Sequence, residues 1–164
     1  MLEFMKKIKL TQNKYAIIDN GDFERVNKLK WYYDSTGYAA HKSGKIAIRM
    51  HQFILNTPKG MITDHINHDK LDNRKINIRI CLRMNNLWNM RKSRGKSKYK
   101  GVYFNGSDGR IKRWVAQIRA NNKVKNLGYF LTEEEAAQQY NKFAKMLHGK
   151  FAWLNFIKNA LGNL

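Results

Sequence analysis

The sequence predicts an α+β protein: a β-rich N-terminal segment, a strand–loop–strand–helix unit, and a three-stranded antiparallel sheet packed on one helix. Apolar and polar residues alternate along several short stretches, turn signals separate these stretches, and a capped helical pattern follows the last of them. The 164 residues have room for one or two small domains. We expect consecutive segments at residues 1–56, 57–93, 94–98 and 99–164.

The first segment reads as short strands joined by turns. The string LTQNKYAIID predicts a hairpin with its turn at Gln12-Asn13, and STGYAAHKSGKIAIRM predicts another around Gly44. Between them, DFERVNKLKWYY has helical spacing of its apolar residues. Two roles stay open for this segment, which either contacts a ligand or supports the unit that follows.

The second segment is dense in polar residues. MITDH and INIRI predict two strands around the polar loop INHDKLDNRK, and LRMNNLWNMR predicts a short helix. Asp64 and His65 end the first strand, Asn77 lies near the start of the second, and Asn86 lies in the helix. Because successive strand residues point to opposite faces, we expect the side chains of Asp64 and His65 to diverge.

Residues 94–98 are small and basic and predict a linker to a third segment. There, YKGVYF, RWVAQIRA and KVKNLGYF predict three antiparallel strands, with a hairpin turn at Asn121-Asn122. Trp114, Ala116 and Ile118 are expected on one face of the sheet, and the residues between them on a polar, basic face.

A helix is predicted after the third strand. Thr132 and Glu135 form a capping box, and Gly149 ends the helical pattern. The apolar stripe that faces the sheet is predicted to consist of Ala136, Tyr140, Phe143 and Leu147.

The charge of the chain points to a polyanionic partner. Lys and Arg number 32 against 12 Asp and Glu, a net charge of +20. Ten of these cations lie between Asn73 and Ser107, where no acid occurs, and Trp88 and Tyr99 lie among them. Cations bind phosphates and aromatic rings stack on bases, so nucleic acid is the expected partner, with a membrane surface second. A solvated basic face is the alternative interpretation.

Several classes of protein are excluded. The single cysteine, Cys81, excludes an intrachain disulfide and a multi-cysteine zinc site. No apolar run approaches the roughly 18 residues of a membrane span, and the start MLEFMKKIKL lacks the apolar stretch of a signal peptide. We expect a cytoplasmic protein with no membrane partner and no disulfide partner.

The polar residues of the second segment suit phosphodiester hydrolysis. A neutral imidazole can accept a proton from the attacking water near pH 7. The departing oxygen needs a positive partner, and a hard cation such as Mg²⁺ prefers carboxylate and amide oxygens. His65 and the pair Asp64 and Asn86 have these chemical types.

This segment resembles the ββα-metal motif of HNH nucleases, especially the HNH homing endonucleases of phages and mobile introns. The resemblance rests on Asp64-His65, on Asn77 twelve residues after His65, and on Asn86 twenty-one after it. It implies that His65 is the general base, that Asp64 and Asn86 bind Mg²⁺ or Mn²⁺, and that Asn77 pins the loop and orients the imidazole. Arg83 is the implied phosphate clamp.

The other histidines have weaker signals. The family has a glycine a few residues beyond the base, whereas this chain has INHD there, including His68. His51, in RMHQFIL, resembles an upstream family histidine and is expected to pack against the site. We expect His41 and His148 at the surface.

The strings SKYKGVYF, RWVAQIRA, LGYFLTEEEAAQQYN and FAWLNF resemble the plant ethylene-response-factor type of DNA-binding domain, which occurs joined to phage HNH nucleases. The resemblance implies a sheet laid in the major groove of double-stranded DNA. Tyr103 and Asn126 depart from the family, which has arginine and tryptophan at these places. With the basic run, the expected DNA contacts are Arg79, Arg91, Lys92, Lys100, Tyr103, Arg110, Arg113, Gln117, Arg119 and Lys125.

Together these features predict a metal-dependent, homing-type DNA endonuclease of a phage-infected or bacterial cell, with a monomer favoured. The main alternative is a non-catalytic DNA-binding regulator, which shares the charge and the C-terminal segment. An RNA-binding protein is a third possibility. Whether Asp64, His65 and Asn86 converge separates the first two.

Overall fold

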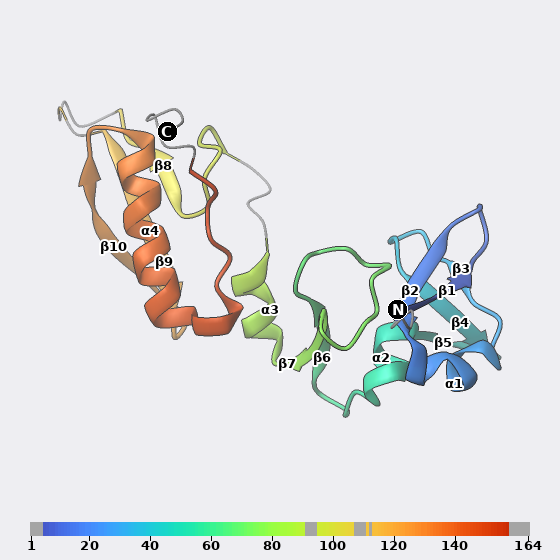
Figure 1. The fold of residues 1–164 in the computed structure, drawn as a ribbon. Helices are drawn as coiled ribbons and strands as arrows, with labels where there is room; N and C mark the ends of the chain where they lie inside the picture. The colour runs from blue at the N-terminus through green and yellow to red at the C-terminus, as the bar shows by residue number, and fades with distance from the viewer. Residues whose placement is uncertain (1–4, 91–94, 107–110, 112, 158–164) are drawn as a thin grey trace. The chain divides into compact units, whose positions relative to one another are not determined.

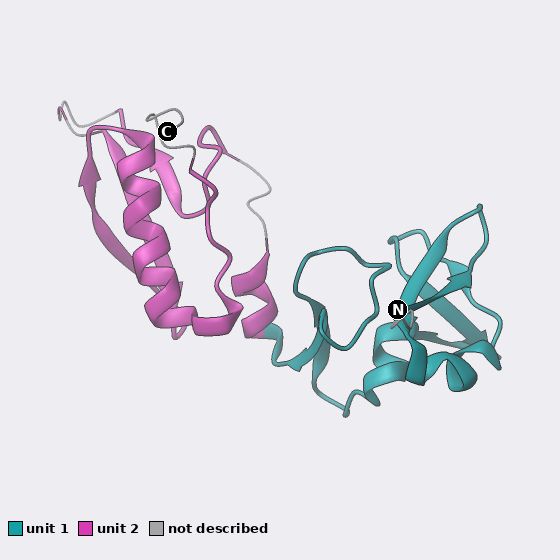
Figure 2. Ribbon diagram, viewed as in Figure 1, with its two compact units in different colours: residues 1–83 teal, residues 84–164 magenta. Residues whose placement is uncertain are grey.

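The computed structural model describes residues 5–90, 95–106, 111 and 113–157. Its chain forms two compact units, residues 1–83 and 84–164 (Figure 2). Small antiparallel sheets and helices make up the described residues (Figure 1), so the predicted α+β class is confirmed. The predicted division into four segments stays a prediction.

The first unit opens with the predicted hairpin. β1 (Met5–Lys9) pairs with β2 (Tyr15–Asp19), and Gln12 and Asn13 in the turn have φ of 58° and 53°. Asparagine tolerates this left-handed conformation better than most residues, which explains the strong turn signal. The first strand ends at Lys9, earlier than the sequence pattern indicated.

The second predicted hairpin is also present. A three-stranded sheet contains β3 (Tyr32–Tyr33), β4 (Ala39–Ser43) and β5 (Ile46–Arg49) in that order, and the β4–β5 turn includes Gly44 with φ of 60°. Short helices precede and follow this sheet, and the one predicted over DFERVNKLKWYY covers only its first part. The elements are η1 (Asn20–Asp22), α1 (Phe23–Asn27), β3 (Tyr32–Tyr33), β4 (Ala39–Ser43), β5 (Ile46–Arg49) and α2 (Met50–Leu55).

The strand–loop–strand–helix order predicted for the middle of the chain is observed. β6 (Ile62–His65) pairs antiparallel with β7 (Ile78–Cys81), and α3 (Arg83–Asn89) follows. Only Arg83 of this helix belongs to the first unit, because the second unit begins at Met84.

The N-terminal elements support the loop between β6 and β7. Ile78 lies in the same buried core as residues of β1, β2, α1 and α2. The backbone N–H of Ile17 donates to the Leu71 carbonyl (2.8 Å), and the N–H of Asn73 donates to the Ile17 carbonyl (2.7 Å). The supporting role left open for residues 1–56 is therefore observed.

The second unit contains the predicted sheet and helix. β8 (Val102–Phe104), β9 (Trp114–Ala120) and β10 (Lys123–Phe130) form an antiparallel sheet in the order β10-β9-β8, covered by α4 (Glu133–His148) (Figure 1). A 3-10 turn, η2 (Gly149–Phe151), follows.

The ends of α4 are capped as predicted, with one difference. The Thr132 hydroxyl accepts from the Glu135 backbone N–H (3.1 Å), and Gly149 at the C-cap has φ of 52°. The Glu135 carboxylate accepts from the N–H of Leu131 (3.2 Å). In a capping box, this carboxylate would accept from the N–H of Thr132, whereas here it bonds to the preceding residue.

Two predicted faces need correction. Leu147 was expected in the stripe facing the sheet, but it is 38% exposed, and His148, expected at the surface, is 5% exposed. Nε2 of His148 is bonded to the Arg119 carbonyl (2.9 Å), so one nitrogen of this buried ring has a partner, while Nδ1 is buried without a hydrogen bond. Val115, expected on the polar face, is fully buried between its cross-strand neighbours Tyr103 and Tyr129.

The thiol of Cys81 is buried in the first unit. Across the residues that the structure describes, no helix is both long and apolar enough to cross a bilayer.

Candidate active site

The two residues that end β6 point to opposite faces of the β6–β7 hairpin, as predicted. Asp64 lies opposite Arg79 and His65 lies opposite Ile78 in the antiparallel register. Cross-strand partners share a face, so Asp64 faces Arg79 while His65 lies on the face of Ile78. Both Asp64 and His65 are only 5% exposed.

Asn73 fixes the imidazole of His65. Its Oδ1 lies 3.2 Å from His65 Nε2, and its Nδ2 donates to the Leu71 carbonyl (3.1 Å). The Leu71 bond sets the orientation of the amide, so an oxygen faces the ring. Because an amide oxygen can only accept, Nε2 carries the proton, and the neutral ring has its basic lone pair at Nδ1.

Aromatic side chains enclose the same imidazole. The His51 ring lies edge-on at 4.8 Å between centroids, and the Tyr38 ring lies 5.8 Å from His65 and 5.1 Å from His51. The predicted packing of His51 against the site is therefore confirmed.

This enclosure sets the protonation of both histidines. Burial lowers the pKa of His65, although the Asn73 bond and the Asp64 charge act against it. Burial lowers the pKa of His51 to about 3, and its neighbours His65 and Arg49 add to this effect. Both rings are neutral near pH 7, so His65 is able to accept a proton.

Asn77 holds the ends of the loop together. Its Oδ1 accepts from the Asn67 backbone N–H (2.9 Å), and its Nδ2 donates to the Asp72 carbonyl (2.7 Å). The side chain is buried, so these bonds are shielded from water. Asp72 in turn accepts two bonds of 2.7 Å from the Arg74 guanidinium, which keep the pKa of Asp72 low.

His68 occupies a glycine-like backbone conformation in this loop. Its φ is 65°, in the left-handed region that glycine adopts at little cost. A histidine thus occupies a conformation that favours glycine, in a loop where this sequence lacks the family's glycine.

Arg79, expected to contact DNA, is bonded within the site. Its Nε and Nη2 donate to Asp64 Oδ2 at 3.0 and 2.7 Å, and its side chain is only 14% exposed. The ion pair satisfies a buried carboxylate that would otherwise be costly. It also orients that carboxylate from the neighbouring strand.

The chemistry of Asp64 fits a hard divalent cation, which prefers oxygen donors. Within the described part of the chain, no group of three or more His, Cys, Asp or Glu side chains is placed to bind one ion. If one carboxylate and one amide were the protein ligands of such a cation, phosphate and water would complete its coordination shell.

The predicted residues of α3 share one face of that helix, because Arg83 and Asn86 are three positions apart. Arg83 is exposed and Asn86 is half-buried. Asn86 belongs to the second unit, whereas Asp64 and His65 belong to the first. The convergence of Asp64, His65 and Asn86 therefore stays a prediction.

In the second unit, the predicted DNA contacts separate by face. On β9, Gln117 and Arg119 are exposed and share a face with Tyr103 of β8. Arg113 is exposed directly before β9. Lys125 pairs with Ile118 and so lies on the helix-facing side, where its ammonium is 5.3 Å from the centre of the Phe143 ring.

The remaining predicted contacts lie elsewhere. Lys100 precedes β8 instead of lying on a strand, and its ammonium is bonded to backbone carbonyls of the same unit. Arg91, Lys92 and Arg110 lie outside the described residues.

Two residues of the site were not singled out by the sequence. Asn73 orients the imidazole of His65, and the sequence patterns assigned it no role. Tyr38 lies in a predicted hairpin and gave no signal at all. Such contacts depend on how the loop folds back, which a linear pattern does not report.

Comparison with known proteins provides one relative. The chain is 31% identical over 150 residues to a protein of Acanthamoeba polyphaga mimivirus that is named an uncharacterized HNH endonuclease. The similarity covers 87% of this chain and 75% of the viral protein. No protein-family model and no solved structure matches the chain.

Proposed function

Because this chain belongs to the HNH endonuclease family, we propose that it is a metal-dependent, homing-type endonuclease that hydrolyses phosphodiester bonds of double-stranded DNA. The observation that carries this proposal is the environment of His65. Its ring is buried and neutral, its Nε2 is bonded to Asn73, and it lies next to the carboxylate of Asp64 in sequence. This is the preparation that a general base for water requires.

His65 accepts the proton of the attacking water at Nδ1. Asn73 holds Nε2–H, and this bond strengthens as the ring becomes cationic. The rings of Tyr38 and His51 restrict the rotation of the imidazole and exclude bulk water from one side of it. Asn77 acts indirectly as a positioning residue, because it closes the loop that carries Asn73.

Asp64 and Asn86 are the proposed ligands of Mg²⁺ or Mn²⁺. The ion supplies Lewis-acid stabilisation of the departing oxygen when it is bound. Arg79 fixes the orientation of the Asp64 carboxylate, and Arg83, on the same face of α3 as Asn86, is the proposed phosphate contact. The assignment of Asn86 rests on its spacing from His65 in the sequence.

The second unit is the proposed DNA-binding part. The three antiparallel strands with one covering helix support this proposal, because such a sheet leaves its other face open to a ligand. Tyr103, Gln117 and Arg119 supply an exposed aromatic ring, an amide and a cation on the outer face of the sheet. These groups suit stacking, base-edge hydrogen bonds and phosphate binding.

The test combines plasmid cleavage with a DNA-binding measurement. Supercoiled plasmid is incubated with the full-length protein and Mg²⁺ or Mn²⁺, with and without chelator, and nicked and linear products are separated on a gel. His65→Gln replaces the imidazole by a neutral amide of similar size and so removes the base. We expect cleavage to fall by roughly 10² to 10⁴-fold while DNA affinity in chelator stays unchanged.

His41→Gln is the matched control, because His41 contacts the Lys30 carbonyl and not the site. Full cleavage by the His65→Gln variant would refute the assignment of the base. DNA binding by the wild-type protein without any metal-dependent cleavage would identify a non-catalytic DNA-binding protein instead.

A further inference from the structure

Helix α3 is too short to be stable by itself. It has seven residues, about two turns, and isolated helices of this length are not stable in water. Its orientation must therefore come from the elements that contact it. The contacts described below all lie within the second unit, which contains every residue of α3 except Arg83.

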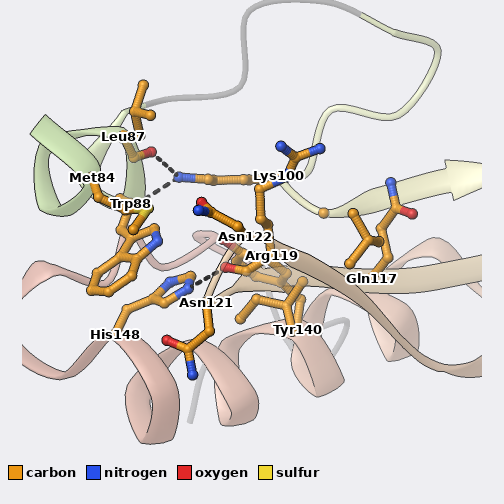
Figure 3. Close-up of a pocket in the computed structure, with 13 residues that line it drawn as sticks. Met84, Leu87, Trp88, Lys100, Gln117, Arg119, Asn121, Asn122, Tyr140 and His148 are labelled. Atoms are coloured by element: carbon orange, nitrogen blue, oxygen red, sulfur yellow. Dashed lines mark hydrogen bonds between the residues drawn. The ribbon is translucent and has the colours of Figure 1, made fainter.

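The ammonium of Lys100 binds the C-terminal end of this helix. Its Nζ donates to the carbonyls of Leu87 (3.2 Å), Trp88 (2.7 Å) and Met90 (2.8 Å), and Figure 3 shows the first two bonds. The last carbonyls of a helix have no partner within it and carry partial negative charge. Three N–H donors thus meet three acceptors at the place where a cation is most favourable.

The backbone of Lys100 is fixed in turn. Its N–H donates to Asn155 Oδ1 (2.7 Å), and Asn155 Nδ2 donates back to the Lys100 carbonyl (3.0 Å). Asn155 is bonded through its own backbone to the side chain of Asn141 on α4, at 2.7 and 2.8 Å. A continuous hydrogen-bonded path therefore runs from α4 through Asn155 and Lys100 to α3.

A second contact holds the same helix. The Trp88 ring stacks on His148 of α4, with 4.5 Å between centroids and an angle of 7°, and Figure 3 shows His148 bonded to the Arg119 carbonyl. The N–H of Trp153 donates to the Trp88 carbonyl (3.1 Å). A cavity of about 310 Å³ remains beside these residues, so packing alone does not fill the space around α3.

We infer that Lys100 is a positioning residue of the nuclease, which anchors α3 to the second unit and thereby orients Asn86. This inference rests on the proposed function. It gives the second unit a structural role in addition to DNA binding, which is to hold the helix that contains Asn86. It also replaces the DNA contact that the sequence suggested for Lys100, because all three of its N–H donors are used within the unit.

The test compares Lys100→Met with Lys142→Met in the full-length protein. Methionine keeps the apolar stem but not the donors, and Lys142 is an exposed residue of α4. Hydrogen exchange of peptides covering residues 84–90 measures the anchoring of α3. In the Lys100→Met variant, we expect the amides of residues 84–90 to exchange about tenfold faster or more, whereas the Lys142→Met variant should exchange like the wild-type protein.

Three further measurements report on the proposed metal site, on cleavage and on DNA binding. Electron paramagnetic resonance measures the affinity for Mn²⁺ alone, a gel assay measures the cleavage rate, and anisotropy in chelator measures DNA affinity. Lys100→Met should weaken Mn²⁺ binding and slow cleavage by about tenfold, with DNA affinity changed less than about twofold. Lys100→Arg, which keeps a cation and N–H donors, should recover part of both losses.

The outcomes separate the alternatives. Weaker DNA binding with unchanged exchange of α3 would overturn the inference and make Lys100 a DNA contact. Lost protection with unchanged Mn²⁺ affinity and cleavage would overturn the role in orienting Asn86. If the wild-type protein neither bound Mn²⁺ nor cut DNA, the proposed function and the catalytic part of the inference would both fail. Exchange would still decide whether Lys100 anchors α3.

Discussion

Replacing Asn77 by alanine should open the loop between β6 and β7 without affecting the second unit. The side chain makes two shielded hydrogen bonds, to the Asn67 N–H and to the Asp72 carbonyl. Alanine leaves both backbone groups without this partner, and each such loss costs about 1–3 kcal/mol. Two such losses sum to about 2–6 kcal/mol, which is the loss of stability that we expect in the first unit.

Hydrogen exchange during urea titration measures this loss for each unit separately. Peptides from residues 5–19 report on the first unit and peptides from residues 114–130 on the second. Asn27→Ala, at an exposed position of α1, is the control and should change stability by less than about 0.5 kcal/mol. A loss for Asn77→Ala as small as the control's, or an equal loss in both units, would refute the role assigned to Asn77.

Three other perturbations follow from the structure. Because the pKa of His51 is about 3 in the folded chain and near 6.5 when unfolded, only the unfolded state gains this proton as pH falls from 6.5 towards 3. Stability of the first unit should drop by up to about 1.4 kcal/mol per pH unit in that range, and His51→Phe should flatten the slope measured by urea titration. Gly101→Ala should lower the unfolding temperature of the second unit, measured by calorimetry, because its Cβ would lie 2.1 Å from Tyr140 Cδ2 and its φ is +73°. Gly44→Ala has a similar φ of +60° but open space around its Cβ, so it adds backbone strain without a clash and should lower the unfolding temperature of the first unit less. Arg119→Ala should weaken DNA binding and reduce the slope of log affinity against log salt concentration by about one, the value for one phosphate contact. Lys125→Ala should leave the affinity and the slope unchanged, because Lys125 lies on the helix-facing side of the sheet, and equal effects of the two substitutions would contradict this assignment of faces.

Local signals predicted most elements of the fold. The turns at Gln12-Asn13 and Asn121-Asn122 adopt positive φ, which asparagine tolerates well, and Thr132 and Gly149 bound α4. These features depend on a few neighbouring residues, so a single sequence contains the information they need.

Packing between distant elements was harder to predict. The stripe of α4 was assigned by residue type, and so Leu147 was preferred to His148. The His148 ring is buried because it stacks on Trp88 and because its Nε2 is bonded to the Arg119 carbonyl. The face of the sheet on which Lys125 lies could have been predicted from the sequence. Counting back from the two-residue turn pairs it with Ile118.

The candidate site could also be predicted only in part. Motif spacing singled out Asp64, His65 and Asn77, and in the structure they are hydrogen-bonded to Arg79, Asn73 and Asn67, respectively. The role of Asn73 was not predictable, because it depends on a loop that folds back over eight residues to reach the imidazole.

The attachment of α3 to the second unit determines where this protein can be recombined with another recognition module. A junction in the basic stretch at residues 94–98 would separate Trp88 from His148 and the helix carbonyls from Lys100. A junction near residue 83 would transfer the helix together with its anchors. If Asn86 binds the metal as proposed, a new target specificity could not be acquired by exchanging the C-terminal part without also importing a piece of the catalytic centre.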